Sequence, residues 1–370
     1  MNIFKKEPKY IHGQTPNIGV LLINLGTPTT YKTSDIRKYL KEFLSDHRVV
    51  EIPKFIWWFI LRGIILPFRS RKSAQKYKTI WTDNGSPLLI NIKNQSSALE
   101  KLFYNYENNI KNLNPSNIKI KYAMRYNTPN IKKVLYELKQ ENISHLIILP
   151  LYPQYCSSTT GSTLDCVFDE LKAWRVIPSI RTINHYHDNP EYIQALAIQV
   201  RQSWHIYGIP NFKHNDKLLI SFHGVPQRSL ELGDYYHCQC YKTARLLANE
   251  LNLTEQDYIV SFQSRLGKAK WLEPYTDVTL QKLAKNNVRV DVICPGFSSD
   301  CLETLEEIAI EGKETFLSSG GREFNYIPCL NDSKHGMQAI YKIVLDNMYD
   351  IHMPSLQELQ DSKEAYSKVK

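Results

Sequence analysis

A histidine lies where an apolar strand is predicted to end. His223 closes the run LLISF at residues 218–222 and is followed by Gly224 and Pro226, which predict a turn. The matching position after an earlier apolar run holds the aliphatic Leu25. A histidine at a strand end is often structural, but the contrast with Leu25 favours a chemical role. A neutral imidazole near pH 7 can accept a proton from a weak N–H acid, so His223 is a candidate base.

Three acids follow a second apolar strand and predict a path for protons or metal ions. Asp300, Glu303 and Glu307 come after the run at residues 290–294, at three- and four-residue spacing. On a helix that begins near Ser299 they would share one side. Acids in the first turn of a helix also complement the helix dipole, and this structural role is an alternative explanation for Asp300 and Glu303. The dipole explains Glu307 less well, because that residue lies a turn further on. Like charges lined up in a cleft raise one another's pKa or attract a cation, which suits traffic of protons or divalent metal.

Strands alternate with amphipathic helices along the chain, and the pattern occurs twice. Residues 18–28 and 217–226 are matching strand-and-turn segments, and residues 129–150 share their proline spacing with residues 274–295. Such alternation is typical of parallel sheets joined by right-handed helical crossovers. Ligands bind such sheets at the carboxyl ends of the strands. We therefore expect an α/β fold with two similar domains, each a parallel sheet flanked by helices, and an active-site cleft between them.

The predicted domain boundaries follow from this repeat. We expect the first domain at residues 14–185, completed by a C-terminal helix at 335–350, and the second domain at 186–334. A polar tail is predicted at 351–370, because this stretch is rich in charged residues and carries few apolar ones.

Residues 55–68 form the most apolar stretch of the chain, inside a segment of the first domain at 50–72. A bilayer span takes roughly 20 residues, and Arg62 interrupts the stretch, so it is not predicted to be transmembrane. It is either a helix packed on the core or an exposed aromatic lip that surrounds an apolar ligand or rests on a membrane. Three basic residues close behind it could meet anionic groups: Arg69, Arg71 and Lys72. Peripheral membrane contact through residues 55–72 is therefore an expectation.

Composition indicates a globular protein in a reducing compartment. Of the 370 residues 42% are hydrophobic, and the net charge of +9 favours anionic partners. The basic residues are scattered rather than grouped in blocks, so nucleic acid is not an expected partner. The seven cysteines include no CxxC pair, and Cys238 and Cys240 are too close in sequence for the usual zinc spacing. The residues after Met1 form no apolar signal core, so a cytoplasmic location is expected.

Several segments together resemble the signature segments of ferrochelatases, in particular the bacterial protoporphyrin ferrochelatases. They are LINLGTP (22–28), MRY (124–126), YPQY (152–155), STTG (158–161), SFHGVP (221–226) and SDCLETLEE (299–307). The resemblance runs in order from about residue 18 to residue 348. It implies two Rossmann-like domains of the chelatase type with a porphyrin in the cleft between them. It also implies a lyase that inserts ferrous iron into protoporphyrin IX to form protohaem, the terminal step of haem biosynthesis.

The resemblance assigns roles to individual residues. His223 corresponds to the active-site histidine of the family, and Glu303 corresponds to its catalytic glutamate. The residues implied to meet the metal are His223, Glu303, Asp300 and Glu307. The residues implied to bind the porphyrin are Leu25, Tyr77, Arg125, Tyr126, Gln263, Ser264 and Trp271.

Departures from the family narrow the expected chemistry. Some ferrochelatases hold an iron–sulfur cluster through C-terminal cysteines, whereas here no cysteine follows Met348 and Cys329 is isolated. We therefore expect no cluster and no permanently bound cofactor, with ferrous iron as a substrate. Cys301 stands where some relatives have a second histidine, so that residue's role does not carry over. Two alternatives stay open, namely metallation of coproporphyrin or another tetrapyrrole, and a tetrapyrrole carrier without turnover. The apolar stretch at 55–68 favours protoporphyrin, and His223 together with the acids favours an enzyme.

Overall fold

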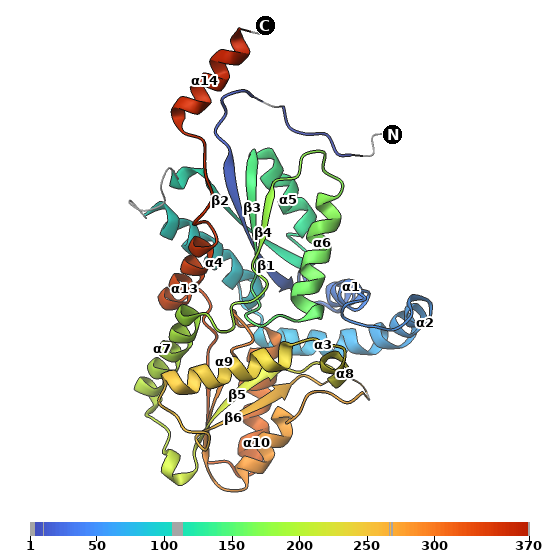
Figure 1. Cartoon of the computed structure of the whole chain (residues 1–370). Coiled ribbons are helices and arrows are strands. Elements are labelled where there is room, and N and C mark those ends of the chain that lie inside the picture. Colours follow the sequence, from blue (N-terminus) through green and yellow to red (C-terminus); the bar gives the residue numbers. More distant parts are fainter. Residues whose placement is uncertain (1–3, 10, 106–113, 266, 268, 369–370) are drawn as a thin grey trace.

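The chain folds into two four-stranded parallel sheets, one in the upper and one in the lower half of Figure 1. The computed structural model describes residues 4–9, 11–105, 114–265, 267 and 269–368. The strand order is β2-β1-β3-β4 in the first sheet and β6-β5-β7-β8 in the second. The strands are β1 (Asn17–Gly26), β2 (Ile118–Tyr126), β3 (Ile143–Pro150), β4 (Ser179–Thr182), β5 (Lys217–His223), β6 (Tyr258–Gln263), β7 (Arg289–Ile293) and β8 (Glu323–Ile327). The same order in both sheets confirms the predicted α/β fold with two similar halves.

The central strands are continuous apolar runs because helices cover both faces of each sheet. In β1 every residue from Ile18 to Asn24 is buried, and β7 is buried along its whole length. Parallel sheets covered on both faces favour such runs over an alternating pattern. In the second sheet His223 pairs with Gln263, so the last residues of β5 and β6 lie side by side.

Helices fill the connections between the strands. In the first half they are α1 (Thr33–Leu44), α2 (Lys54–Ile60), α3 (Leu66–Ile80), α4 (Pro87–Tyr104), α5 (Ile131–Gln140) and α6 (Ser162–Leu171), with the π-helices η1 (Leu61–Ile65) and η3 (Ser157–Gly161) and the 3₁₀ turn η2 (Pro115–Asn117). The later ones are α7 (Pro190–Tyr207), η4 (Phe212–His214), α8 (Gln227–Glu231), α9 (Tyr236–Glu250), α10 (Thr276–Ala284), α11 (Leu302–Thr304), the π-helix η5 (Leu305–Gly312), α12 (Lys313–Ser318), α13 (Lys334–Asp346) and α14 (Leu356–Ser367).

One continuous apolar core joins the two sheets. Helices α4, α7, α9 and α13 bury side chains against one face of each sheet, so that Leu22 of β1 and Leu218 of β5 belong to the same cluster as Leu99, Val200 and Val344. The other faces are covered separately, by α5 and α6 in the first half and by α10, η5 and α12 in the second. Apolar packing in the shared core therefore fixes the position of one sheet relative to the other.

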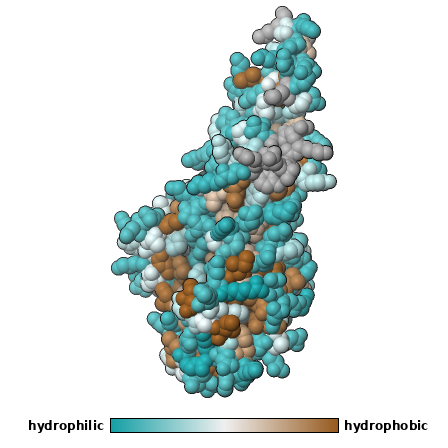
Figure 2. All heavy atoms as spheres, turned by 90° about the vertical axis from the view of Figure 1, so that its left-hand side faces the viewer, coloured by the Kyte–Doolittle hydropathy of each residue, from teal (hydrophilic) through white to brown (hydrophobic). Residues whose placement is uncertain are grey.

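On the outer side of α4, α7 and α13, hydrophobic side chains form separate patches in a mostly hydrophilic surface (Figure 2).

Helices α1, α2 and α3 form an insertion between β1 and α4 that extends to one side of the molecule (Figure 1). Its last helix reaches the second half, where Lys76 Nζ lies 2.7 Å from carboxylate oxygens of both Glu306 and Glu311. The insertion thus brings α3 alongside η5, which belongs to the segment that carries the predicted acids.

The apolar stretch at 55–68 forms α2, η1 and the start of α3. Leu61 and Leu66 are buried against the rest of the insertion. The opposite side leaves large hydrophobic side chains exposed: Phe55, Ile56, Trp58, Phe59, Ile64 and Phe68. The stretch therefore has both a packed side and an exposed apolar side. In the part of the chain that the structure describes, no helix is long and apolar enough to cross a membrane.

Helix α13 contacts both halves of the molecule. The ring of Tyr341 packs 4.7 Å from that of Phe103 on α4, and His335 Nε2 lies 2.8 Å from Gln199 Oε1 on α7. Because this helix is shared, the division into 14–185 with 335–350, and 186–334, stays a prediction.

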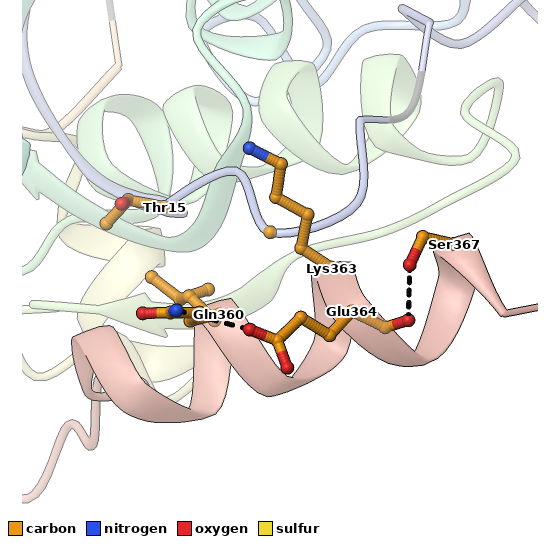
Figure 3. Close-up of a pocket in the computed structure, with 7 residues that line it drawn as sticks. Thr15, Gln360, Lys363, Glu364 and Ser367 are labelled. Carbon is orange, nitrogen blue, oxygen red and sulfur yellow. Dashed lines mark hydrogen bonds between the residues drawn. The ribbon is translucent and has the colours of Figure 1, made fainter.

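The predicted polar tail at 351–370 contains α14. Ser355 caps this helix by accepting a hydrogen bond from the backbone N–H of Glu358, whose carboxylate bonds back to Ser355. A surface hollow of about 530 Å³ between α14 and the N-terminal segment is lined by Gly13, Thr15, Leu359, Gln360, Lys363, Glu364 and Ser367 (Figure 3). It lies beside the amino end of β1, away from the strand ends where His223 and the acids lie.

Candidate active site

His223 is the last residue of β5, and its ring has one nitrogen left for chemistry. Its Nδ1 lies 2.6 Å from the carbonyl oxygen of Gly224. A carbonyl oxygen only accepts, so Nδ1 carries the hydrogen and Nε2 of the neutral ring keeps its lone pair. The half-buried ring meets Phe297 edge-on at 6.3 Å between centroids. This tautomer is the one that can accept a proton at Nε2.

Gly224 allows two loops to meet beside His223. Its N–H donates to the carbonyl oxygen of Gln263 at 2.7 Å, and an added Cβ would lie 2.7 Å from that oxygen and 3.2 Å from a ring carbon of Trp271. Real Cβ contacts are never that close to backbone, so the position requires glycine. The loop that carries Trp271 is thereby held against the end of β5.

Glu307 occupies the space next to His223. Its carboxylate accepts hydrogen bonds from the backbone N–H of Ser264, at 2.7 Å, and from the Ser264 hydroxyl. Burial raises the pKa of Glu307, the Ser264 bonds and the charge of His223 lower it, and the negative charge of Glu303 raises it again. The three side chains are therefore electrostatic neighbours, and Glu307 holds a proton more strongly than an ordinary glutamate.

Glu303 connects the two halves of the molecule. Its backbone carbonyl accepts a hydrogen bond of 2.6 Å from Gln263 Nε2 in the second sheet. Its carboxylate faces the insertion: burial raises the pKa of Tyr39 and Tyr77 well above the ordinary value, and the charge of Glu303 adds to both effects. Burial lowers the pKa of Arg69, and the charge of Glu303 opposes that shift. The acid thus lies between the end of β6 and the helices α1 and α3.

The three predicted acids do not share one side of a regular helix. The helix begins at Leu302 rather than near Ser299, and from Leu305 it continues as the π-helix η5. Asp300 precedes the helix. π-Helical turns are rare and are frequently found at functional sites. The expectation of an α-helical row is corrected, although Glu303 and Glu307 still lie close together.

Asp300 accepts hydrogen bonds on both oxygens of its carboxylate. Its carboxylate accepts hydrogen bonds from Tyr326 Oη at 2.5 Å, Thr304 Oγ1 at 3.1 Å and Asn331 Nδ2 at 2.6 Å, and the side chain is 7% exposed in relative terms. With both oxygens occupied by donors, it fixes the loop that leads into α11. The role of Asp300 toward the metal stays a prediction.

Leu25 and Tyr77 lie where the first half meets this loop. Leu25, near the end of β1, is half-buried against a cluster that contains Tyr77, and Leu302 and Leu305 pack on the same cluster. The end of β1 therefore adjoins the first turn of α11. Of the predicted substrate-binding residues, Leu25 and Tyr77 thus adjoin α11, and Trp271 lies beside Gly224 at the end of β5.

Arg125 and Tyr126 are held inside the first half. Arg125 Nη2 lies 2.5 Å from Asp46 Oδ2, and Tyr126 Oη donates to the same oxygen at 2.9 Å. The Arg125 guanidinium stacks 4.6 Å above the Tyr126 ring, which is fully buried. Both side chains thus bind Asp46 in this structure, and their predicted role in porphyrin binding stays a prediction.

Gln263 and Ser264 act on protein groups. Gln263 is buried, with Oε1 accepting from Ser221 at 2.8 Å and Nε2 donating to Glu303. Ser264 holds the carboxylate of Glu307. Both were predicted to bind substrate, and in the structure both position the acids.

Sequence reasoning missed three residues of this region: Tyr39, Lys76 and Phe297. Tyr39 reaches the neighbourhood of Glu303 through helix packing, and Phe297 reaches His223 through the turn after β7. No local spacing marks either contact. Lys76 is one of many scattered lysines, and only the fold shows that it pairs with Glu306.

Comparison with known proteins gives matches over almost the whole chain. A family model described as Ferrochelatase matches residues 17–348. The ferrochelatase of Janthinobacterium sp. (strain Marseille) is 52% identical over 97% of this chain and 95% of its own length, and that of Herminiimonas arsenicoxydans is 52% identical over 95% and 90%. Among solved structures, CbiX, the terminal enzyme for biosynthesis of sirohaem in denitrifying bacteria, is 10% identical with a TM-score of 0.48 over 89% of this chain and 98% of its own. SirB from Bacillus subtilis is 12% identical with a TM-score of 0.48 over 89% and 95%.

Proposed function

The chain belongs to the ferrochelatase family, and on that premise we propose that it is a lyase that inserts ferrous iron into protoporphyrin IX to form protohaem, the terminal step of haem biosynthesis. The observation that carries the proposal is the row formed by His223, Glu307 and Glu303. It starts from an imidazole whose Nδ1 is committed to the Gly224 carbonyl and ends at an acid that faces the other half of the molecule.

The two protons on the porphyrin nitrogens must leave before iron can occupy the ring. His223 Nε2 accepts a pyrrole proton, because Nδ1 is already committed to the Gly224 carbonyl. Glu307 is a suitable next acceptor, since burial raises its pKa and the positive charge of a protonated His223 is stabilised beside a carboxylate. Each cycle then releases two protons for each ferrous ion taken up.

Glu303 and Glu307 supply the oxygen ligands that bring the ferrous substrate toward the porphyrin. Carboxylate oxygens hold a divalent ion without the tight grip of thiolates, which suits delivery. Asp300 shapes the loop beneath them through its bonds to Tyr326 and Asn331. The porphyrin lies in the predicted cleft between the halves, against Leu25, Tyr77 and Trp271, with Arg69 and the exposed Arg71 offering charge to its propionates.

Anaerobic metallation of protoporphyrin IX with ferrous iron, followed by absorbance, tests this function, with coproporphyrin in parallel. We expect protohaem at the higher rate, because the exposed apolar side of the insertion suits the substrate with fewer carboxylates. A preference for coproporphyrin would change the substrate and keep the chemistry. Binding of porphyrin without any metallation would support the carrier alternative and contradict the enzyme.

The exposed side of α2 and η1 also supports peripheral membrane contact. Phe55 and Trp58 are 75% and 49% exposed, and Arg62 lies 4.3 Å above the Trp58 ring. An apolar surface with cations beside it matches the boundary of an anionic bilayer. We propose that this side rests on the membrane surface while the rest of the protein stays in the cytoplasm.

The wild type should float with vesicles of phosphatidylglycerol and phosphatidylethanolamine. The double variant Phe55→Ser/Trp58→Ser should lose most of this flotation. Both side chains are solvent-exposed, so the variant should melt at the wild-type temperature. Trp57 is left in place because its indole N–H donates to the Leu44 carbonyl at 2.6 Å. Tyr349→Ser, another exposed aromatic removed elsewhere, serves as the matched control and should float normally. If the wild type does not float with the vesicles, the proposed membrane contact is contradicted.

We further propose that the protein works without an iron–sulfur cluster or another bound cofactor. The support is the sequence, in which no cysteine follows Cys329. Ferrous iron is then a substrate that passes through the site and not a resident group.

A further inference from the structure

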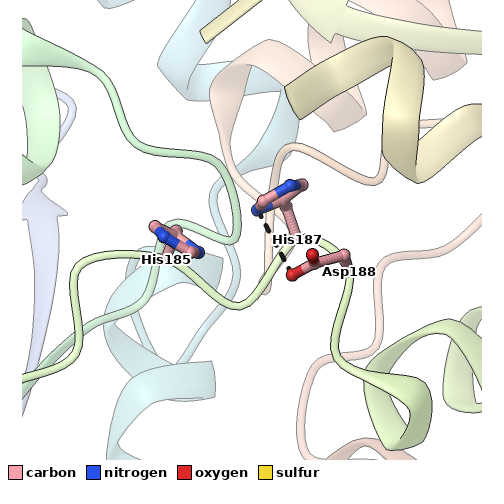
Figure 4. A group of neighbouring side chains, drawn as sticks. All are labelled: His185, His187 and Asp188. Atoms are coloured by element: carbon pink, nitrogen blue, oxygen red, sulfur yellow. Dashed lines mark ion pairs between the residues drawn. The ribbon is translucent and has the colours of Figure 1, made fainter. Parts of the chain in front are cut away.

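Three side chains of metal-binding types converge in the connection between the two sheets. His185, His187 and Asp188 follow β4 and precede α7, and one potential ligand atom from each lies within 4.8 Å of the others. Figure 4 shows His187 and Asp188 facing each other and His185 directed toward them from the other side. The proposed haem chemistry uses none of the three.

His187 gives the strongest sign that something is bound here. Its side chain is 4% exposed in relative terms, and its buried Nδ1 has no hydrogen-bond partner. A buried polar nitrogen without a partner is costly, and most such groups in proteins are satisfied. Asp188 Oδ1 lies 3.6 Å from Nδ1, which is too far for a hydrogen bond.

The same distance suits two ligands of one ion. With metal–ligand bonds of about 2.0–2.1 Å, two donors of a tetrahedral ion lie roughly 3.3 Å apart, so His187 and Asp188 need only a small shift. His185 is exposed, and rotation of its side chain can bring a ring nitrogen into the third position. Water can complete the shell on that exposed side.

The backbone around these residues is held in place before any ion binds. The His187 carbonyl accepts a hydrogen bond from Thr243 Oγ1 on α9 at 2.8 Å, and the Tyr186 N–H donates to the Pro153 carbonyl at 2.9 Å. Asn189 caps α7 by accepting from the Tyr192 N–H at 3.1 Å. Preorganisation of this kind lowers the entropic cost of assembling a metal site.

Asp188 also bears an ion pair, which leaves one oxygen for a metal. Its Oδ2 lies 2.5 Å from Lys242 Nζ, whereas Oδ1 is the atom directed at His187. The Lys242 side chain is 45% exposed and can turn toward solvent if an ion adds positive charge nearby.

We propose that His185, His187 and Asp188 bind one divalent ion of the zinc or cobalt type, at a site distinct from the iron path at His223. Two imidazoles and a carboxylate suit these ions better than Mg²⁺ or Ca²⁺, which prefer oxygen ligands. All three ligands come from residues 185–188, in the connection that leads from β4 to α7. The ion binds whether or not the proposed haem chemistry is correct.

Cobalt and zinc titrations of the full chain test the site. The starting protein is chelator-treated and carries His223→Ala and Glu303→Gln, so that only Glu307 of the proposed iron path keeps its side chain. We expect one Co²⁺ per chain with the intense visible bands of a low-coordinate cobalt ion, and displacement of that ion by Zn²⁺. Loss of a residue that merely supports a metal ligand costs about 10–100-fold in metal affinity, so His185→Ala should weaken binding by at least that factor.

Two further variants make the outcome decisive. Asp188→Asn keeps the shape of the side chain while weakening a ligand, and it should also lower the affinity without relying on a change at the buried His187. His205→Ala removes an exposed histidine from α7 outside the cluster and should leave binding unchanged. The proposal would be overturned if the starting protein bound no ion. It would also be overturned if His185→Ala and Asp188→Asn bound the ion as tightly as the starting protein does.

Discussion

His223→Ala is expected to lower the rate of haem formation by about 10²–10⁴-fold, the contribution that a well-placed general base makes. The reason is the fixed tautomer. Nδ1 bonds to the Gly224 carbonyl, so Nε2 is the only ring atom that can take a pyrrole proton. Removing the ring also removes the group that would pass the pyrrole proton on toward Glu307, its electrostatic neighbour.

Porphyrin binding should survive in His223→Ala, because the contacts proposed for the porphyrin come from Leu25, Tyr77 and Trp271. The His223 ring itself meets Phe297 edge-on. Quenching of porphyrin fluorescence measures this binding separately from turnover. The matched control is His237→Ala, which removes a histidine that stacks on Phe262 in the same half, and it should metallate porphyrin at close to the wild-type rate. Turnover near normal in His223→Ala would show that the histidine is structural.

The fold was the more predictable part, because its signals are local. Buried parallel strands are continuous apolar runs, and β1 and β5 both have that pattern in the sequence. His223 could be found in the same way, since a strand followed by a Gly-containing turn places its last side chain at the carboxyl edge of a sheet. The matching position in the first half holds the aliphatic Leu25, and this contrast favoured a chemical role for His223.

The state of the acids was not predictable, because partners distant in sequence decide it. Asp300 has the same spacing signal as Glu303, yet Tyr326 and Asn331, from β8 and the loop after it, occupy its carboxylate. Local spacing also could not show that the helix changes to π-helical bonding at Leu305. Whether an acid is open or bound is a property of the tertiary structure.

The partner of Arg125 was likewise not predictable from the sequence, because it too is distant in the chain. The resemblance implied that Arg125, near the end of β2, binds the porphyrin, whereas in the structure it pairs with Asp46, 79 positions away in the chain. By contrast, Arg69 lies on α3 close enough for the charge of Glu303 to affect its pKa. The sequence contained both arginines, and only packing of the insertion against the second half distinguishes them.

Glu303→Gln should reduce the metallation rate about 10²-fold or more while the melting temperature changes little. The amide keeps the shape of the side chain and leaves the backbone carbonyl bonded to Gln263, so the loop should hold. Two electrostatic changes oppose each other: repulsion between Glu303 and Glu307 disappears, and attraction between Glu303 and Arg69 is lost. Stability should therefore stay close to that of the wild type, whereas the negative charge that meets the ferrous substrate is gone.

The control for Glu303→Gln is Glu306→Gln, the same chemical change three residues further along. Glu306 pairs with Lys76, which keeps Glu311 as a second partner, so this variant should metallate at nearly the wild-type rate. Steady-state rates at several iron concentrations, with thermal melting of each variant, separate the two outcomes. A collapse of the melting temperature in Glu303→Gln would make the residue structural. Equal loss of rate in both variants would mean that the charge of the whole segment matters and that no single acid receives the iron.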